Sequence, residues 1–239
     1  PGFVVTTEAC VYYSAHGAYP DGLTQEIEDH LRSLEQLTGK TLGDPGNPLL
    51  LSIRSGSVFS MPGMMDTILN LGLNDETVEG MAQKTGNARF AYDSYRRFIS
   101  MFGDVVMGVD PQLFEDALTA KKQEVGAALD TDLSADDLRD LTVRFKTILA
   151  QNAGEQFPAD PLEQLHKSVA AVFKSWDNPR AKVYRRTEGI ADDLGTAVNV
   201  QTMVFGNKGE TSGTGVAFTR DPSTGENFFY GEFLMNAQG

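Results

Sequence analysis

The pattern of apolar and polar positions changes twice along the chain. Up to about residue 73, short apolar runs such as 3–5 and 49–53 alternate with a helical stretch over 23–37. Three leucines of that stretch fall on one helical face: Leu31, Leu34 and Leu37. The run 49–53 is bounded by turn residues, which favours a short buried strand. Residues 1–73 are therefore predicted to form a first α/β part.

Helical spacing dominates from residue 74 to residue 179. Apolar residues recur there at intervals of three and four in the stretches 91–102, 138–148 and 162–176. Residues suited to beginning a helix precede these and neighbouring stretches: Asn74, Asp110-Pro111, Ser134 and Asp160-Pro161. This part is predicted to be a helical insert that packs on itself.

The last part, residues 180–239, returns to β character. Apolar runs over 197–205, 216–218 and 227–235 read as strands, and the segment 221–225 has the residue types of a tight turn. The whole chain is therefore predicted to be α+β. It would have a mixed-strand lobe, a predominantly helical insert and a β-rich end.

The glycine-rich segment Gly206 to Gly225 is the strongest candidate for ligand binding. Four of its glycines could adopt positive φ and turn successive N–H groups inward: Gly206, Gly209, Gly213 and Gly215. Such a nest of N–H groups binds anions, and phosphate is the natural guest. The alternative is a hairpin loop that binds nothing.

Composition and charge exclude several classes of protein. Hydrophobic residues make up 41% of the chain, yet no apolar run approaches the length of a membrane helix. The formal net charge of −13 disfavours binding to nucleic acid or to an anionic membrane. A single cysteine, Cys10, excludes an internal disulfide and fits a cytoplasmic protein. The chain begins at Pro1 and ends directly after a strand-like run, so we expect a fragment of a longer protein.

Common nucleotide, metal and nucleophile motifs are absent. The sequence Gly39-Lys40-Thr41 ends like a P-loop, but Leu34 stands where the motif requires glycine, and the Rossmann glycine pattern is missing. The acidic stretch that begins at Asp130 lacks the glycine and the glutamate of a calcium loop. Neither a nucleophile elbow nor a metal-binding spacing of histidines is present.

Arg54 is the strongest single candidate residue. It is predicted to lie just past the end of a buried strand, where a rigidly placed guanidinium could bind phosphate. The alternative role is a structural salt bridge. The segment Gln201, Thr202, Met203 and Val204 leads into the glycine-rich segment and could offer backbone groups and an apolar surface to adenine. The alternative there is an ordinary core strand.

Several motifs closely resemble the nucleotide-binding domains of the pyruvate, phosphate dikinase family. The resemblance rests on Arg54-Ser55-Gly56, on the run Met61 to Leu73, on Ser175 to Arg180 and on the glycine-rich segment itself. It extends over nearly the whole chain. It implies an incomplete ATP-grasp-type fold, in which two lobes clamp ATP and Mg²⁺.

The resemblance also implies a reaction and a role for each candidate residue. In the family, the β-phosphate of ATP passes to a histidine on a separate swivelling domain and from there to pyruvate, while the γ-phosphate ends on inorganic phosphate. Arg54 would contact the terminal phosphates, Thr214 with Gly213 and Gly215 would cover them, and Gln201 to Val204 would lie beside adenine. The metal ligands and the acceptor histidine would lie outside this chain, which alone would not complete the reaction. Family members are commonly homo-oligomers.

Two alternatives remain open at this point. One is a related dikinase that uses water in place of phosphate, such as phosphoenolpyruvate synthase, although the intact run Met61 to Leu73 favours the phosphate-dependent enzyme. The other is a noncatalytic nucleotide-binding or docking module, in which the helices between Asn74 and Trp176 serve mainly as a scaffold.

Overall fold

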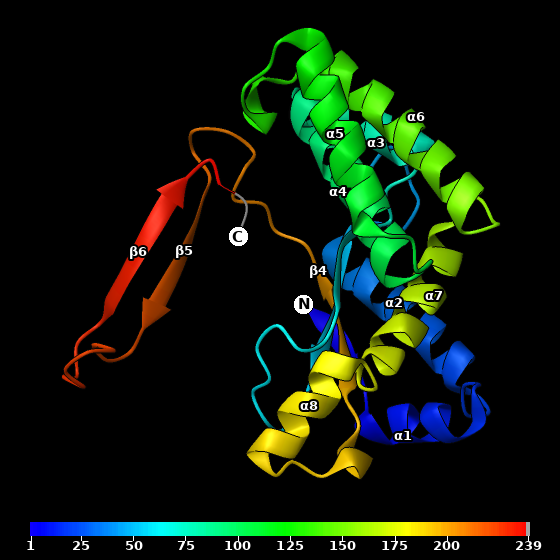
Figure 1. Ribbon diagram of the computed structural model, residues 1–239, viewed down its shortest axis with the longest axis vertical. Helices are drawn as coiled ribbons and strands as arrows, with labels where there is room; N and C mark the ends of the chain where they lie inside the picture. The colour runs from blue at the N-terminus through cyan, green and yellow to red at the C-terminus, as the bar shows by residue number, and fades with distance from the viewer. Residues whose placement is uncertain (238–239) are drawn as a thin grey trace. The chain divides into compact units, whose positions relative to one another are not determined.

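The computed structural model describes residues 1–237 and contains two compact units, Pro1–Met203 and Val204–Gly239 (Figure 1). The three-part division expected from composition, with boundaries at 73 and 179, stays a prediction about domain boundaries. No helix among the described residues is both long enough and apolar enough to cross a membrane.

A four-stranded antiparallel sheet organises the first unit, with strand order β1-β4-β2-β3. Its strands are β1 (Gly2–Val5), β2 (Leu51–Gly56), β3 (Thr67–Leu71) and β4 (Ala197–Thr202). The central pair joins segments almost 150 residues apart, since Ile53 lies opposite Val200 and Arg54 opposite Asn199. The sheet therefore forms only when the long helical segment has brought its two ends together.

The two faces of this sheet differ in character. Ile53, Val198 and Val200 are fully buried on one face, and the helices α1 (Thr7–His16) and α7 (Pro161–Ser175) pack against the central strands. Side chains alternate between the faces along a strand, so Arg54 and Gln201 lie on the opposite face, where both are exposed. This second face is called the polar face below.

The remaining helices follow from local signals in the sequence. They are α2 (Leu23–Thr38), α3 (Asp75–Thr85), α4 (Ala88–Val105), α5 (Pro111–Val125), α6 (Ala135–Asn152) and α8 (Pro179–Glu188), with short 3-10 turns at Asp130–Asp132 and Asp192–Leu194. Asn74 accepts hydrogen bonds from the N–H groups of Glu76 and Thr77, and Asp110, Ser134 and Asp160 cap their helices in the same way. All four predicted caps are confirmed. In α2, by contrast, Leu37 is 73% exposed and does not share the buried face.

The helical segment does not pack only on itself, as the periodicity had suggested. Helices α3, α5 and α6 pack around α4 (Figure 1), but α4 also contacts β3, and α7 contacts β2, β3 and β4. An aromatic cluster fixes α4, with the ring centroids of Phe102 and Phe157 5.4 Å apart and those of Phe98 and Phe157 5.5 Å apart. One continuous core therefore joins the helices to the sheet.

The segment after Asn178 is helical, so the prediction of β character from residue 180 is wrong at its start. Pro179 takes the first helical position of α8, where its fixed φ is already helical. The helix is then held by Arg185, whose buried guanidinium stacks 4.1 Å from the Trp176 ring. Its Nε also donates to Asp192 Oδ1 at 2.7 Å. Tertiary packing of a basic residue thus stabilises a segment that lacks a clear apolar stripe.

The second unit is a hairpin of β5 (Gly213–Phe218) and β6 (Tyr230–Met235), with Thr214 opposite Leu234. The predicted turn is confirmed: Asp221 Oδ1 accepts from the N–H groups of Ser223 and Thr224, and Gly225 has a φ of 77°. Apolar side chains remain exposed along both strands, including Phe233 at 77% and Leu234 at 68%.

Candidate functional site

Arg54 lies within β2, not beyond its end as the sequence indicated. The ladder with β4 continues for two residues past it, because Ser55 pairs with Val198 and Gly56 with Ala197. Serine and glycine are weak strand formers, and the neighbouring strand overrides that preference. The Cα of Arg54 is therefore fixed on both sides by paired strands, β4 and β3.

The guanidinium of Arg54 is exposed on the polar face and carries no internal partner. It makes no ion pair and no side-chain hydrogen bond with any other residue in the range 1–237. Its cross-strand neighbours, Asn199 and Thr67, are polar but uncharged. The structural salt bridge considered above is therefore not found among the described residues, and all five N–H donors can reach a ligand.

Asn199 is a polar-face residue that the sequence reasoning missed. Its Nδ2 donates to Ser55 O at 3.4 Å, and a Cβ on Gly56 would lie only 2.6 Å from that nitrogen. Gly56 thus leaves room for the amide beside Arg54. The alternation of Val198, Asn199, Val200 and Gln201 was the available signal, since period two places both polar residues on one face.

The segment proposed to lie beside adenine begins in β4 and leaves the sheet at Met203. The N–H of Thr202 donates to Pro1 O at 3.0 Å, and the N–H of Met203 donates to Leu50 O at 2.9 Å. These two N–H groups are therefore engaged within the sheet. Gln201 and Val204 are exposed, Val204 at 88%, and Val204 makes no hydrogen bond with another described residue. Val204 is the residue of this segment whose backbone is free.

The loop between β2 and β3 is fastened at its second end by the start of α8. Asp66 accepts from Asn178 Nδ2 at 2.9 Å and forms an ion pair with Arg180, whose Nε donates to Met64 O at 3.0 Å. Val58, near the first end of the loop, is 84% exposed. The loop that follows Arg54 is thus exposed at Val58 but held further along, since the Tyr184 hydroxyl donates to Ser60 O at 3.4 Å and Met61 is 7% exposed.

Asp66, Asp104 and Arg180 line a pocket of about 460 Å³. Burial and the charge of Asp66 raise the pKa of Asp104 above its usual range. The folded protein therefore holds a proton at Asp104 more tightly than the unfolded chain does. The folded state therefore loses stability as the pH rises above about 4, the pKa of an aspartate in the unfolded chain, because Asp104 must then ionise in the folded protein.

We expect Asp104→Asn to raise the melting temperature at pH 7, because the amide removes that cost. The difference should disappear below about pH 3, where the carboxyl is protonated in both states. Thermal unfolding at the two pH values checks this. Asp193→Asn, at an exposed residue, is the matched control and should change little. A lower melting temperature for Asp104→Asn at pH 7 would contradict the prediction.

The glycine-rich segment does not form the predicted nest. Gly213, Thr214 and Gly215 are strand residues of β5, and of the four glycines considered only Gly209 has a positive φ. Pairing with β6 keeps the strand glycines extended. The small size of these glycines instead lets the backbones of β5 and β6 approach closely, since a Cβ on Gly215 would lie 2.7 Å from Glu232 O. The hydroxyl of Thr214 donates to Ala237 O at 2.7 Å.

The described residues do not assemble a metal site. Within the range 1–237, no group of three or more His, Cys, Asp or Glu side chains could hold a metal ion. Cys10 is buried, and burial raises the pKa of its thiol, so it is not an activated nucleophile. Residues 1–237 thus contain no side-chain cluster that would hold Mg²⁺ without the phosphates of a nucleotide.

Comparison with known proteins gives one family over almost the whole chain. The family described as "Pyruvate phosphate dikinase, AMP/ATP-binding domain" matches residues 15–238. The chain is 62% identical over its full length to a pyruvate, phosphate dikinase of Clostridium symbiosum, of which it covers 28%. It is 58% identical to a chloroplastic pyruvate, phosphate dikinase of Flaveria trinervia and 56% identical to one of Giardia intestinalis, covering 25% and 27% of them. The chain thus spans about a quarter of the length of these relatives.

Proposed function

Because the chain belongs to the pyruvate phosphate dikinase AMP/ATP-binding domain family, we propose that it is the ATP-binding part of a pyruvate, phosphate dikinase. The relatives named above carry that name and match this chain throughout its length. The observation that carries the proposal is Arg54, a guanidinium fixed by paired strands on each side and left without an internal partner. A cation held in this way is suited to an anionic ligand.

The proposed overall reaction converts ATP, phosphate and pyruvate into AMP, diphosphate and phosphoenolpyruvate. A histidine nitrogen on a separate swivelling domain of the same protein attacks the β-phosphorus of ATP, and the bond from that phosphorus to the AMP oxygen breaks. The γ-phosphoryl group passes to inorganic phosphate and gives diphosphate. The histidine then donates its phosphoryl group to the enol oxygen of pyruvate.

Arg54 is proposed to contact the terminal phosphates of ATP. Its planar guanidinium can hold two phosphate oxygens at once and stabilise negative charge as it moves between them. Asn199, beside it on the polar face, would add a neutral amide donor. Neither side chain needs to break an ion pair among the described residues before it binds.

The other candidate residues are proposed to hold the rest of the nucleotide. Gln201, Thr202, Met203 and Val204 would lie beside adenine, with the free backbone of Val204 as the edge-reading group. Gly213, Thr214 and Gly215 would cover the phosphates, with the N–H groups of Gly213 and Gly215 as donors on the side of β5 that does not face β6. Thr214 lies between these two glycines, with its N–H directed to β6 and its hydroxyl donating to Ala237 O.

The whole protein can be tested with ATP labelled separately at the β- and γ-phosphates. We expect the β-label on a protein histidine with or without added phosphate, and the γ-label to leave the protein as diphosphate only when phosphate is added. Release of the γ-label as free phosphate when no phosphate is added would favour a water-dependent dikinase. ATP binding with no transfer of either label would favour a noncatalytic nucleotide-binding module.

Cofactor, assembly and compartment belong to the same proposal. Mg²⁺ would accompany ATP, with its ligands in other parts of the whole protein. That protein is proposed to be a homo-oligomer and cytoplasmic, although relatives include chloroplastic enzymes. The net charge of −13 argues against nucleic acid as a partner.

A further inference from the structure

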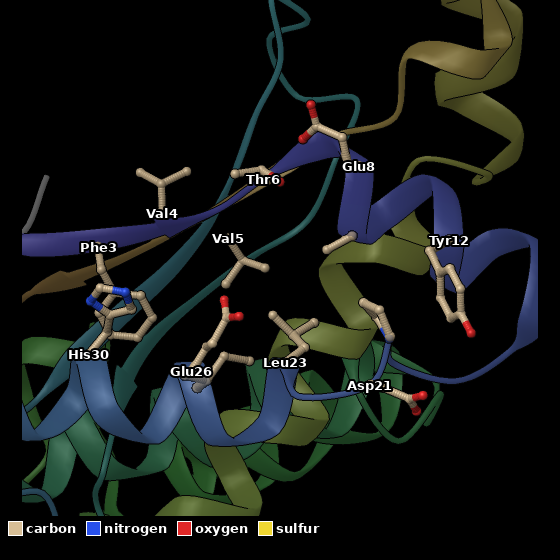
Figure 2. A pocket seen from close by; sticks show the side chains of 13 residues that line it. Phe3, Val4, Val5, Thr6, Glu8, Tyr12, Asp21, Leu23, Glu26 and His30 are labelled. Atoms are coloured by element: carbon tan, nitrogen blue, oxygen red, sulfur yellow. The ribbon is translucent and has the colours of Figure 1, made fainter.

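A pocket of about 420 Å³ lies in the first unit between β1, α1 and α2, and the proposed reaction does not use it (Figure 2). Its floor is apolar and consists of the buried side chains of Val5, Leu23 and Ile27. Figure 2 shows Val4 pointing away from α2, and Phe3 stacked on His30 with ring centroids 5.8 Å apart. The pocket thus combines an apolar floor with an aromatic side wall.

The backbone of β1 forms one wall of this pocket. β1 is an edge strand that pairs with β4 alone among the described strands. Four consecutive residues, Phe3 to Thr6, line the pocket. Side chains of consecutive strand residues point to opposite faces, so the pocket must extend along the free edge of the strand.

The direction of the β1 backbone groups follows from the ladder. Pro1 O accepts from the N–H of Thr202 in β4, and inward and outward groups alternate along an antiparallel strand. Phe3 and Val5 therefore direct their N–H groups to β4, whereas Val4 and Thr6 direct theirs to the free edge. That edge offers a hydrogen-bonding template for an added strand.

The ionisable side chains around the pocket are mostly acidic. Glu8 from α1, Glu26 from α2 and Asp21 from the connection between them are all exposed. Among the described residues that line the pocket, His30 is the one basic side chain. An occupant that pairs with β1 would therefore meet carboxylates on both flanking helices. Positive side chains complement such a site.

We propose that the free edge of β1 and this pocket receive an extended, positively charged and partly apolar segment from the remainder of the same polypeptide. The segment would add a fifth strand to the sheet, place apolar side chains over Val5 and Ile27, and direct lysine side chains toward Glu8 and Glu26. A source within the same polypeptide is favoured because the relatives are about four times as long as this chain. Tethering gives such a segment a high effective concentration.

Hydrogen exchange in the whole protein tests the added strand. We expect the amides of Val4 and Thr6 to exchange at least about 100-fold more slowly than in an unstructured peptide. Val4→Pro removes the outward N–H but leaves the ladder to β4 intact, and should release Thr6 to fast exchange. Val4→Ala keeps that N–H and is the matched control. Fast exchange of both amides in the unsubstituted protein would overturn the proposal.

Zero-length cross-linking identifies the source of the segment without depending on any variant. A carbodiimide joins a carboxylate to a neighbouring amine, so we expect links from Glu8, Asp21 or Glu26 to lysines beyond these 239 residues. Mixing ¹⁴N- and ¹⁵N-labelled protein separates the sources. Links confined to one isotope support the proposal, whereas mixed-isotope links identify a second copy and overturn it. Absence of any such link also overturns it.

Discussion

Arg54→Ala in the whole protein is expected to slow the partial reaction with ATP by about 100- to 1000-fold, the usual effect of losing a preorganised donor to transition-state charge. Transfer between phosphohistidine and pyruvate should stay within about twofold of normal, because Arg54 is proposed to act only where ATP binds. The two half-reactions are measured separately, by AMP formation and by exchange of label between pyruvate and phosphoenolpyruvate.

Two further variants sharpen the Arg54 experiment. Arg54→Lys keeps the charge but loses the forked geometry, so an intermediate loss is expected. Arg32→Ala, at an exposed helix position paired with Asp29, is a control for removing one positive charge and should leave both half-reactions unchanged. If Arg54→Ala slowed both half-reactions equally, the proposed role of Arg54 at the ATP phosphates would be wrong.

Gly80→Ala is expected to destabilise the first unit by at least about 3 kcal/mol, in the range of severe steric substitutions. Gly80 lies inside α3, where helix propensity alone would make alanine about 1 kcal/mol more favourable. In the folded protein alanine is instead expected to be unfavourable at this position, because a Cβ on Gly80 would lie 1.6 Å from Pro45 O. The carbonyl belongs to the backbone, so the loop at 44–48 and the helix would have to separate.

Urea denaturation and thermal unfolding measure the effect. For a chain of this size the melting temperature should fall by roughly 6–12 °C. Gln83→Ala, at an exposed position of the same helix, is the matched control and should stay within about 0.5 kcal/mol of the unsubstituted protein. Gly80→Ala with unchanged or higher stability would show that Pro45 does not approach this helix.

Helix starts were predictable because their signals are local. Asn74, Ser134, Asp110 and Asp160 each satisfy N–H groups two or three residues away, so a short window of sequence contains the whole interaction. Helix α8 was missed for the opposite reason. Its stability depends on the contact of Arg185 with Trp176 and Asp192, and residue spacing does not reveal that contact.

The polar face could be predicted only in part. Arg54 and Gln201 were both identified as candidates, but their shared face depends on the register between β2 and β4, which lie far apart in the chain. Asn199 was overlooked because it was read as part of an apolar run. The predicted glycine nest failed because pairing with β6 sets the conformation of Gly213 and Gly215, and a glycine's own freedom does not.

Trp176 makes the first unit observable by intrinsic fluorescence. It is the single tryptophan of the chain, it is 2% exposed, and its Nε1 donates to Asp192 O at 2.8 Å. The second unit contains phenylalanine and tyrosine but no tryptophan. Indole emission from this chain therefore responds to loosening of the junction between α7 and α8. A melting curve followed by that emission would report the unfolding of the first unit alone.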